Sequence, residues 1–250
     1  MRIIDSHAHY DDSAFDNDRY DILDELFSGD ICKLINVGCS VKSSYSSIAL
    51  AEKYPGIYAA VGLHPDSADE IDRIDEIRQL CGREKAVAVG EIGLDYHYEN
   101  HSREVQKRAF REQLELAAEL HMPVIIHSRD AWEDTMDILR KYRPKGVMHC
   151  FSGSAEIARE IVDMGMYVGF TGVVTFKNAK KALKALEVIH EDRLLVETDC
   201  PYMAPEPNRG KRNFSGYLPH TIAAMAAVKG VSPEKMAEIT AENAEKLFNI

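Results

Sequence analysis

Long hydrophobic runs are absent from this sequence of 250 residues. No stretch reaches the roughly 18 to 20 apolar residues that a membrane-spanning helix needs, so we expect no membrane association. The opening residues Met1-Arg2-Ile3-Ile4-Asp5 have neither the basic nor the apolar segment of a secretory signal, so we expect a cytoplasmic protein. Glycine and proline are scarce, at 15 and 9 residues, which excludes a collagen and favours an ordinary globular protein.

Cysteine is sparse, and its spacing excludes two kinds of site. The five cysteines are odd in number and scattered, and none belongs to a Cys-x-x-Cys pair. Neither a disulfide framework nor a zinc site built from cysteines is therefore indicated. We expect reduced thiols, in agreement with a cytoplasmic location, at Cys32, Cys39, Cys81, Cys150 and Cys200.

Positive charge is in deficit. The 30 lysines and arginines face 41 aspartates and glutamates, which gives a net charge of −11. Because phosphate binding is driven by lysine and arginine, this balance argues against nonspecific wrapping of nucleic acid. It does not exclude a polyanionic substrate, because divalent cations bound in a cleft can attract phosphate there.

Short apolar runs alternate along the chain with segments of helical periodicity. Runs such as Ala86–Val89 are apolar on both faces, as expected for a parallel sheet that is covered on both sides. The pattern predicts a (β/α)8 barrel, with an open doubly wound sheet as the alternative. No linker, repeat or low-complexity tract divides the chain, so we expect a single domain over residues 1–250. The expected strands are Arg2–Asp5, Lys33–Val37, Ile57–Gly62, Ala86–Glu91, Pro123–His127, Gly146–His149, Tyr167–Thr171 and Leu194–Glu197.

Helical segments lie between these strands and continue after the last one. Those between strands are Tyr20–Phe27, Ser43–Lys53, Ile71–Cys81, Arg103–His121, Ala131–Tyr142, Ala155–Met164 and Asn178–His190. Those after the last strand are Pro219–Lys229, Pro233–Ile239 and Ala241–Phe248.

Histidines and carboxylates lie where the expected strands end. His7 and His9, at positions i and i+2, point to the same face of the first strand and can converge on one metal ion. Each such residue alone has an ordinary explanation, as a turn residue or a hydrogen-bonded core residue. Together they mark the carboxyl ends of the strands, which is the face where barrel active sites are built. The six candidate metal ligands are His7, His9, Glu91, His127, His149 and Asp199.

This ligand set suits divalent cations. Four imidazoles and two carboxylates do not choose among Zn, Mn, Mg, Ni and Co. Six protein ligands exceed the three that a single catalytic zinc takes while it keeps an open position. We therefore expect two divalent metal ions per chain, with Glu91, which is flanked by glycines, as the bridging carboxylate.

Seven short motifs lie in order between Asp5 and Asn213, namely DSHAHYDD, GLHP, GEIGLDYH, PVIIHSRDA, HCFSG, ETDCPY and RGKRN. They resemble the motifs of the TatD family of metal-dependent deoxyribonucleases, within the amidohydrolase-like barrels, over nearly the whole chain. The resemblance implies a (β/α)8 barrel with a metal site at the carboxyl ends of the strands, and hydrolysis of phosphodiester bonds in DNA. It also implies the distribution of ligands: His7, His9 and Asp199 hold one ion, Glu91 bridges, and His127 and His149 hold the second.

Further residues are candidates for substrate binding. His64, in the motif GLHP, is either a contact to phosphate or to a metal-bound water, or a structural turn residue. Arg209, Lys211 and Arg212 concentrate positive charge just past Asp199, which favours a phosphate clamp over a solvated patch.

Three other features lie outside this set. After Asn213 the family often continues with Glu-Pro, whereas this chain reads Phe214-Ser215-Gly216, which leaves the contacts of the substrate loop open. Asp95, Tyr96 and His97, just past Glu91, either line the pocket or belong to a solvated loop. Lysines at helical spacing after the seventh strand are interpreted as a solvated helix face: Lys177, Lys180, Lys181 and Lys184.

These residues predict a metal-dependent hydrolase, namely a monomeric deoxyribonuclease that acts on single-stranded or 3′-ended DNA. In the expected reaction, Glu91 bridges two metal ions, and these ions activate a water molecule that attacks phosphorus. Asp199 orients this water molecule and accepts its proton. One alternative is an amidohydrolase-like enzyme acting on an ester, amide or aminoacyl bond, because the same arrangement polarises a carbonyl group and the fold does not fix the substrate. The other is a noncatalytic protein that binds metal without turnover. The RGKR loop favours the nuclease.

Overall fold

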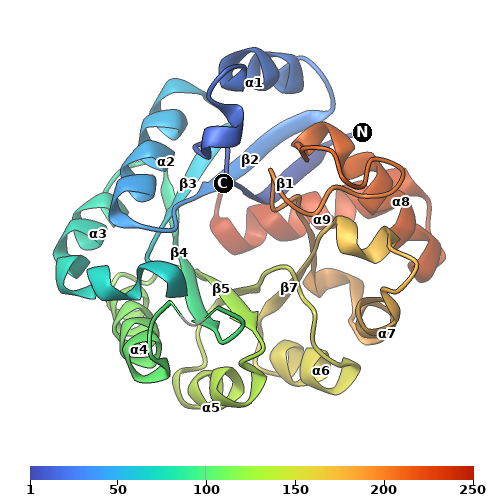
Figure 1. Cartoon of the computed structure of the whole chain (residues 1–250). Coiled ribbons are helices and arrows are strands. Elements are labelled where there is room, and N and C mark those ends of the chain that lie inside the picture. Colours follow the sequence, from blue (N-terminus) through green and yellow to red (C-terminus); the bar gives the residue numbers. More distant parts are fainter. Residues whose placement is uncertain (99) are drawn as a thin grey trace. The chain divides into compact units, whose positions relative to one another are not determined.

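The computed structural model describes residues 1–98 and 100–250 of the chain. Internal contacts divide the chain into two compact units, the first comprising residues 1–35 and 150–250 and the second residues 36–149. In each unit, parallel strands are followed by helices (Figure 1). Within the part of the chain that is described, no helix is both long enough and apolar enough to cross a membrane.

The first unit carries the beginning and the end of the chain. β7 and β8 pair in parallel, with Val168 opposite Leu194 and Phe170 opposite Val196. The last helix, α9, packs against β1 and β8, and Asn243 on this helix donates a hydrogen bond to the Leu194 carbonyl at 2.9 Å. The elements of this unit are β1 (Ile3–Ala8), η1 (Ser13–Phe15), α1 (Arg19–Phe27), α6 (Ala155–Asp163), β7 (Tyr167–Phe170), η3 (Gly172–Thr175), α7 (Lys180–Val188), η4 (Glu191–Arg193), β8 (Leu194–Val196), η5 (Ser215–Tyr217), α8 (Leu218–Lys229) and α9 (Pro233–Phe248), and β2 (Ile31–Val37) runs from it into the second unit.

The first and last strands of the chain meet within this unit. Ala8 and Cys200 form a parallel bridge just beyond β8. The Asp199 amide donates to the His7 carbonyl at 2.9 Å, and the His9 amide donates to the Cys200 carbonyl at 3.0 Å. The strands follow one another in the sheet in the order β1 to β8. This order, with β1 back against β8, excludes the open doubly wound sheet and confirms the (β/α)8 barrel.

The second unit holds the central strands, and its helices lie outside them (Figure 1). β4 pairs in parallel with both β3 and β5. Gly93 allows β4 and β5 to approach closely, because its φ is +144° and a Cβ atom there would lie 2.0 Å from the His127 carbonyl oxygen. The elements are α2 (Val41–Lys53), β3 (Ile57–Val61), η2 (Pro65–Arg73), α3 (Ile74–Cys81), β4 (Ala86–Asp95), α4 (Arg103–Glu119), β5 (Val124–Arg129), α5 (Trp132–Tyr142) and β6 (Gly146–Met148).

Serine caps mark several helix starts. The side chains of Ser40, Ser102, Ser154 and Ser232 each accept a hydrogen bond from a backbone amide in the first turn that follows. Such caps satisfy amides that have no partner inside the helix. They explain why α2, α4, α6 and α9 begin where they do.

Several boundaries differ from those expected. β4 does not end at Glu91 but continues to Asp95, because β5 also continues and pairs Asp95 with Arg129. The two helices expected after Pro233 are one helix, α9, in which the Thr240 hydroxyl donates a hydrogen bond to the Met236 carbonyl at 3.0 Å and does not interrupt the helix. The segment before Ile74 is a 3₁₀ helix with a kink at Ser67, so α3 begins three residues later than expected.

Candidate metal centre

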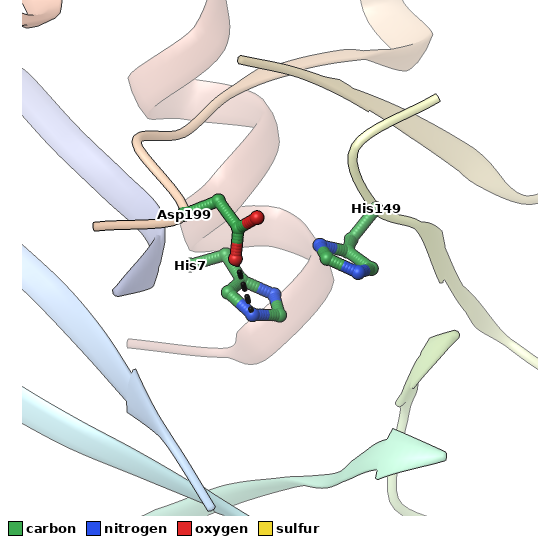
Figure 2. Close-up of side chains that lie close together, drawn as sticks. All are labelled: His7, His149 and Asp199. Carbon is green, nitrogen blue, oxygen red and sulfur yellow. Dashed lines mark ion pairs between the residues drawn. The ribbon is translucent and has the colours of Figure 1, made fainter. Parts of the chain in front are cut away.

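Three of the expected ligands converge within the first unit. His7, at the end of β1, is fully buried, and His9 and Asp199 follow strands β1 and β8. The Nε2 atoms of the two histidines lie 3.0 Å apart, and Asp199 Oδ1 lies 3.7 Å from the first and 3.4 Å from the second. Figure 2 shows the His7–Asp199 pair as a dashed line and also draws His149, a residue of the second unit. Two imidazole nitrogens and a carboxylate oxygen therefore meet, as the i, i+2 spacing of the histidines predicts.

The buried carboxylate of Asp5, in β1, connects this strand to the segment after β8. Asp5 accepts hydrogen bonds from the Thr198 hydroxyl at 2.7 Å, the Thr198 amide at 3.0 Å and the Ser215 hydroxyl at 2.7 Å. Burial raises the pKa of Asp5 to about 6, against the opposing effect of the Ser215 and Thr198 hydrogen bonds. The Ser215 amide also donates to the Tyr10 hydroxyl at 2.8 Å. Ser215, where the chain departs from the family pattern, thus belongs to the support of the cluster.

The other carboxylate near the end of β8 has a different role. Glu197 is fully buried and accepts hydrogen bonds from the Ser6 hydroxyl at 3.2 Å and from the Cys150 amide. It therefore braces the strand ends rather than joining the cluster of His7, His9 and Asp199.

The remaining expected ligands converge on one carboxylate in the second unit. Glu91 is 3% exposed, and its Oε1 lies 2.8 Å from His127 Nδ1 and 2.7 Å from His149 Nε2. His64 Nε2 lies 3.8 Å from the same oxygen. Side-chain donor atoms of His64, Glu91 and His127 all lie within 4.8 Å of one another, which suits a metal ion. For His64 the sequence left two alternatives, a contact to phosphate or water and a structural turn residue. Its Nε2 lies beside Glu91, and its Nδ1 accepts a hydrogen bond from the Asp66 amide at 3.1 Å at the start of η2, as a turn residue would.

In the second cluster, burial and the neighbouring charges act in opposite directions on the pKa values of both Glu91 and His64. Burial alone would raise the pKa of Glu91, but His149, His64 and His127 hold it well below its usual range. Burial lowers the pKa of His64 to about 4, although the Glu91 charge opposes that effect. A deprotonated carboxylate beside a neutral imidazole is the state in which both groups can bind a metal ion.

Asp95 is a site residue for which the sequence left a solvated loop as the alternative. Its side chain is 2% exposed, and its Oδ2 lies 3.2 Å from His127 Nε2, on the side of the ring opposite Glu91. The sequence held one signal for Asp95. Positions 91 and 95 are an even number of residues apart, so their side chains lie on the same face if the strand continues past Glu91. Cys39, predicted only as a reduced thiol, also reaches the cluster, with Sγ 3.8 Å from Glu91 Oε2.

The three cations expected to clamp phosphate have different surroundings. The Arg212 guanidinium donates to both carboxylate oxygens of Asp18 and to the Ala14 carbonyl. Lys211 Nζ donates to Asn208 Oδ1 at 3.0 Å. Arg209 is exposed, and its guanidinium lies 4.4 Å from the centre of the Phe176 ring. Arg209 is thus the member most open to substrate, whereas Arg212 is occupied with holding the loop against η1 and α1.

Known proteins resemble this chain over its whole length. Residues 4–249 match the model of the family described as TatD related DNase. YabD of Bacillus subtilis strain 168, named as an uncharacterized metal-dependent hydrolase, is 42% identical, with 99% of each chain covered. The 3′-5′ ssDNA/RNA exonuclease TatD of Salmonella typhimurium is 34% identical over 95% of each chain. The crystal structure of YjjV, a TatD homologue of Escherichia coli K12, superposes with a TM-score of 0.93 at 31% identity, covering 100% of this chain and 98% of the other.

Proposed function

This chain belongs to the TatD related DNase family, a family with metal-dependent hydrolases among its members, and from that premise we propose that it is a nuclease that removes nucleotides from the 3′ end of single-stranded DNA. The observation that carries the proposal is the Glu91 carboxylate, buried against the rings of His127 and His149 with His64 close by. Burying a carboxylate is costly unless cations or hydrogen bonds compensate it. A relative named as a 3′-5′ ssDNA/RNA exonuclease supports the choice of substrate.

The donor set fits divalent cations. Imidazole nitrogens and carboxylate oxygens bind Zn, Mn, Ni or Co, and Mg accepts the carboxylates. We propose that His7, His9 and Asp199 would hold one ion, that His127 and His149 would hold another, and that Glu91 would be shared. The support for metal binding by these residues is the barrel fold, in which active sites form at the carboxyl ends of the strands.

The chain's own residues divide the remaining work. Divalent ions in these ligands would lower the pKa of a water molecule and neutralise charge on the phosphoryl oxygens. The side chains of Asp199 and His9 are 14% and 11% exposed, whereas His7 is fully buried, so water can reach the Asp199 carboxylate. We assign Asp199 the acceptance of the proton that the attacking water loses. Arg209 would meet substrate phosphate, with Lys211 beside it, while Arg212 fixes the loop that carries them.

The remaining expectations stay part of this proposal. A single domain agrees with one family model that matches residues 4–249. A cytoplasmic location agrees with five cysteines that are all free thiols. The monomeric state stays a prediction.

A substrate panel tests the proposal. Protein stripped by a chelator and reloaded with Mn, Mg, Co, Ni or Zn is incubated with 5′-labelled single-stranded DNA, duplex DNA, RNA and ester substrates. We expect single-stranded DNA to shorten stepwise from its 3′ end only after reloading. Asp199→Asn should lower kcat by about 10² to 10⁴, whereas the exposed Asp163→Asn, which removes the same charge, should not. Hydrolysis of esters without hydrolysis of DNA, or full activity in metal-free protein, would overturn the proposal.

A further inference from the structure

Four lysines lie in the segment that follows β7, and we call them the lysine row: Lys177, Lys180, Lys181 and Lys184. All four are exposed. Three belong to α7, whose buried face consists of Ala182, Ala185 and Leu186. Because helix positions three and four residues apart share a face, these three form a stripe away from the buried face, and Lys177 lies in the turn that precedes the helix.

Several surface cations outside the lysine row have acidic partners, as in Arg78–Glu119 at 2.6 Å, Arg108–Asp72 at 2.9 Å and Lys235–Glu238 at 2.7 Å. Throughout residues 1–98 and 100–250, no acidic side chain lies within ion-pair distance of a lysine in the row. Lys184 has one acidic neighbour beyond that distance, Glu156, with which it interacts electrostatically. In a chain with a net charge of −11, four exposed lysines within eight residues still concentrate positive potential on this segment.

The row begins beside the loop that follows Asp199. β7 and β8 are parallel neighbours, so η3 and Asp199 leave the sheet at the same edge. The Glu206 amide donates to Thr175 Oγ1 at 2.8 Å. Arg209 stacks on Phe176, the residue that precedes the row.

The two segments also meet through their backbones. A Cβ atom on Gly172 would lie 2.3 Å from the Met203 carbonyl oxygen, so only glycine permits this approach. Exposed cations therefore continue from the loop of Asp199, through Arg209, onto α7.

We propose that the lysine row binds the phosphate backbone of a single-stranded nucleic acid at nucleotides beyond the one being cleaved. The inference rests on the proposed nuclease function and adds that the substrate is an extended strand rather than a dinucleotide. A row of flexible ammonium groups contacts successive phosphates without reading bases, because each lysine is a point charge on a long stem. Arg209 connects this surface to the reactive end.

Binding and kinetics on long and short substrates test the row. The variant Lys180→Gln/Lys181→Gln/Lys184→Gln keeps residues that favour helix. The matched control, Lys53→Gln/Lys141→Gln/Lys145→Gln, removes three exposed lysines that precede the amino ends of β3 and β6. Each metal-loaded protein is titrated with a phosphorothioate oligothymidylate, which resists hydrolysis, at several salt concentrations. The kcat/KM is then measured on a long oligothymidylate and on a thymidine dinucleotide.

We expect the row variant to bind the long strand about tenfold more weakly and to lose about 2 from the slope of log affinity against log salt, roughly 0.7 for each lysine. Its kcat/KM on the long strand should fall by a similar factor and stay unchanged on the dinucleotide. The control should match the parent on both. An unchanged affinity and salt slope in the row variant, or an equal loss in the control, would overturn the proposal.

The two proposals fail in different ways. A parent protein that binds the long strand through the row but hydrolyses no DNA would overturn the nuclease and support the row. If the parent protein and the row variant hydrolyse DNA equally well, the nuclease proposal is supported and the proposal about the lysine row is overturned. Equal melting temperatures of the row variant, the control and the parent establish that the comparison concerns binding and not folding.

Discussion

The side chain of Asp95 decides which nitrogen of His127 can serve a metal ion. Nε2 of the ring faces the Asp95 carboxylate, and Nδ1 faces Glu91. A histidine that donates one ring N–H to a carboxylate presents the lone pair of its other nitrogen to a metal. The Asp95 Oδ1 atom is itself fixed by the His97 amide at 2.8 Å. Asp95 therefore positions His127 without being a ligand.

Replacing Asp95 by Asn tests this positioning role. The amide would keep an acceptor for the His97 backbone but would place an N–H donor against the N–H of His127. We expect metal affinity to fall about 10- to 100-fold with little change in the melting temperature of the metal-free protein. Affinity is measured by titration with a competing chelator, and Asp130→Asn, an exposed acid of the neighbouring loop, is the control. Unchanged metal affinity would show that His127 needs no second partner.

At the scale of elements, apolar runs predict where strands lie but not how far they extend. The run Ala86–Val89 predicts β4, yet the polar and glycine-rich continuation to Asp95 forms strand only because β5 pairs with it. In the same way, the polar stretch around Thr240 gave no sign that α9 is continuous. The extent of a strand therefore depends on pairing with residues distant in the sequence as well as on the local preference for strand structure.

Asn243 holds α9 to η4 and to the first residue of β8. Its side-chain amide donates to the carbonyls of Glu191 at 2.8 Å and Leu194 at 2.9 Å. Asn243→Ala leaves both carbonyls without this donor, so we expect the free energy of unfolding to fall by about 1 to 3 kcal/mol. Denaturant titration measures the change, with the exposed Glu242→Ala as control. An equal loss in both variants would point to helix propensity rather than to these hydrogen bonds.

For the whole molecule, the sequence predicts the barrel and six candidate ligands at the carboxyl ends of its strands, because strand ends of a parallel barrel share one face. It does not predict the residues that support them. Asp5, Thr198 and Ser215 form a buried network from parts of the chain that are 193 and 210 residues from Asp5, and such partners have no local spacing signal. The partner of Arg212, Asp18, was hidden for the same reason.

Metal ions should stabilise the folded chain as a whole. A ligand that binds only the folded state, at about 100 times its Kd, adds about 2.7 kcal/mol, and for a chain of this length that is a rise in Tm of roughly 5 to 10 °C. Thermal melts with chelator and with added Mn or Zn measure the shift. His7→Ala should reduce it and Asp163→Asn should not. A Tm that changes neither with chelator nor with added metal would contradict the presence of a bound metal centre.

The contact between residues 7–9 and residues 198–200, which we call the seam, has a consequence for how the protein is made. The His7 carbonyl and the Thr198 hydroxyl, which meet there at 3.3 Å, are 191 residues apart in the chain. During synthesis, an N-terminal portion that already carries His7 and His9 has no Asp199 to complete their cluster until the segment after β8 has left the ribosome. A translation product that ends before β8 would lack that carboxylate altogether. The seam thus delays assembly of these three candidate metal ligands by about 190 residues of synthesis, so shorter copies could not hold a metal ion with this ligand set.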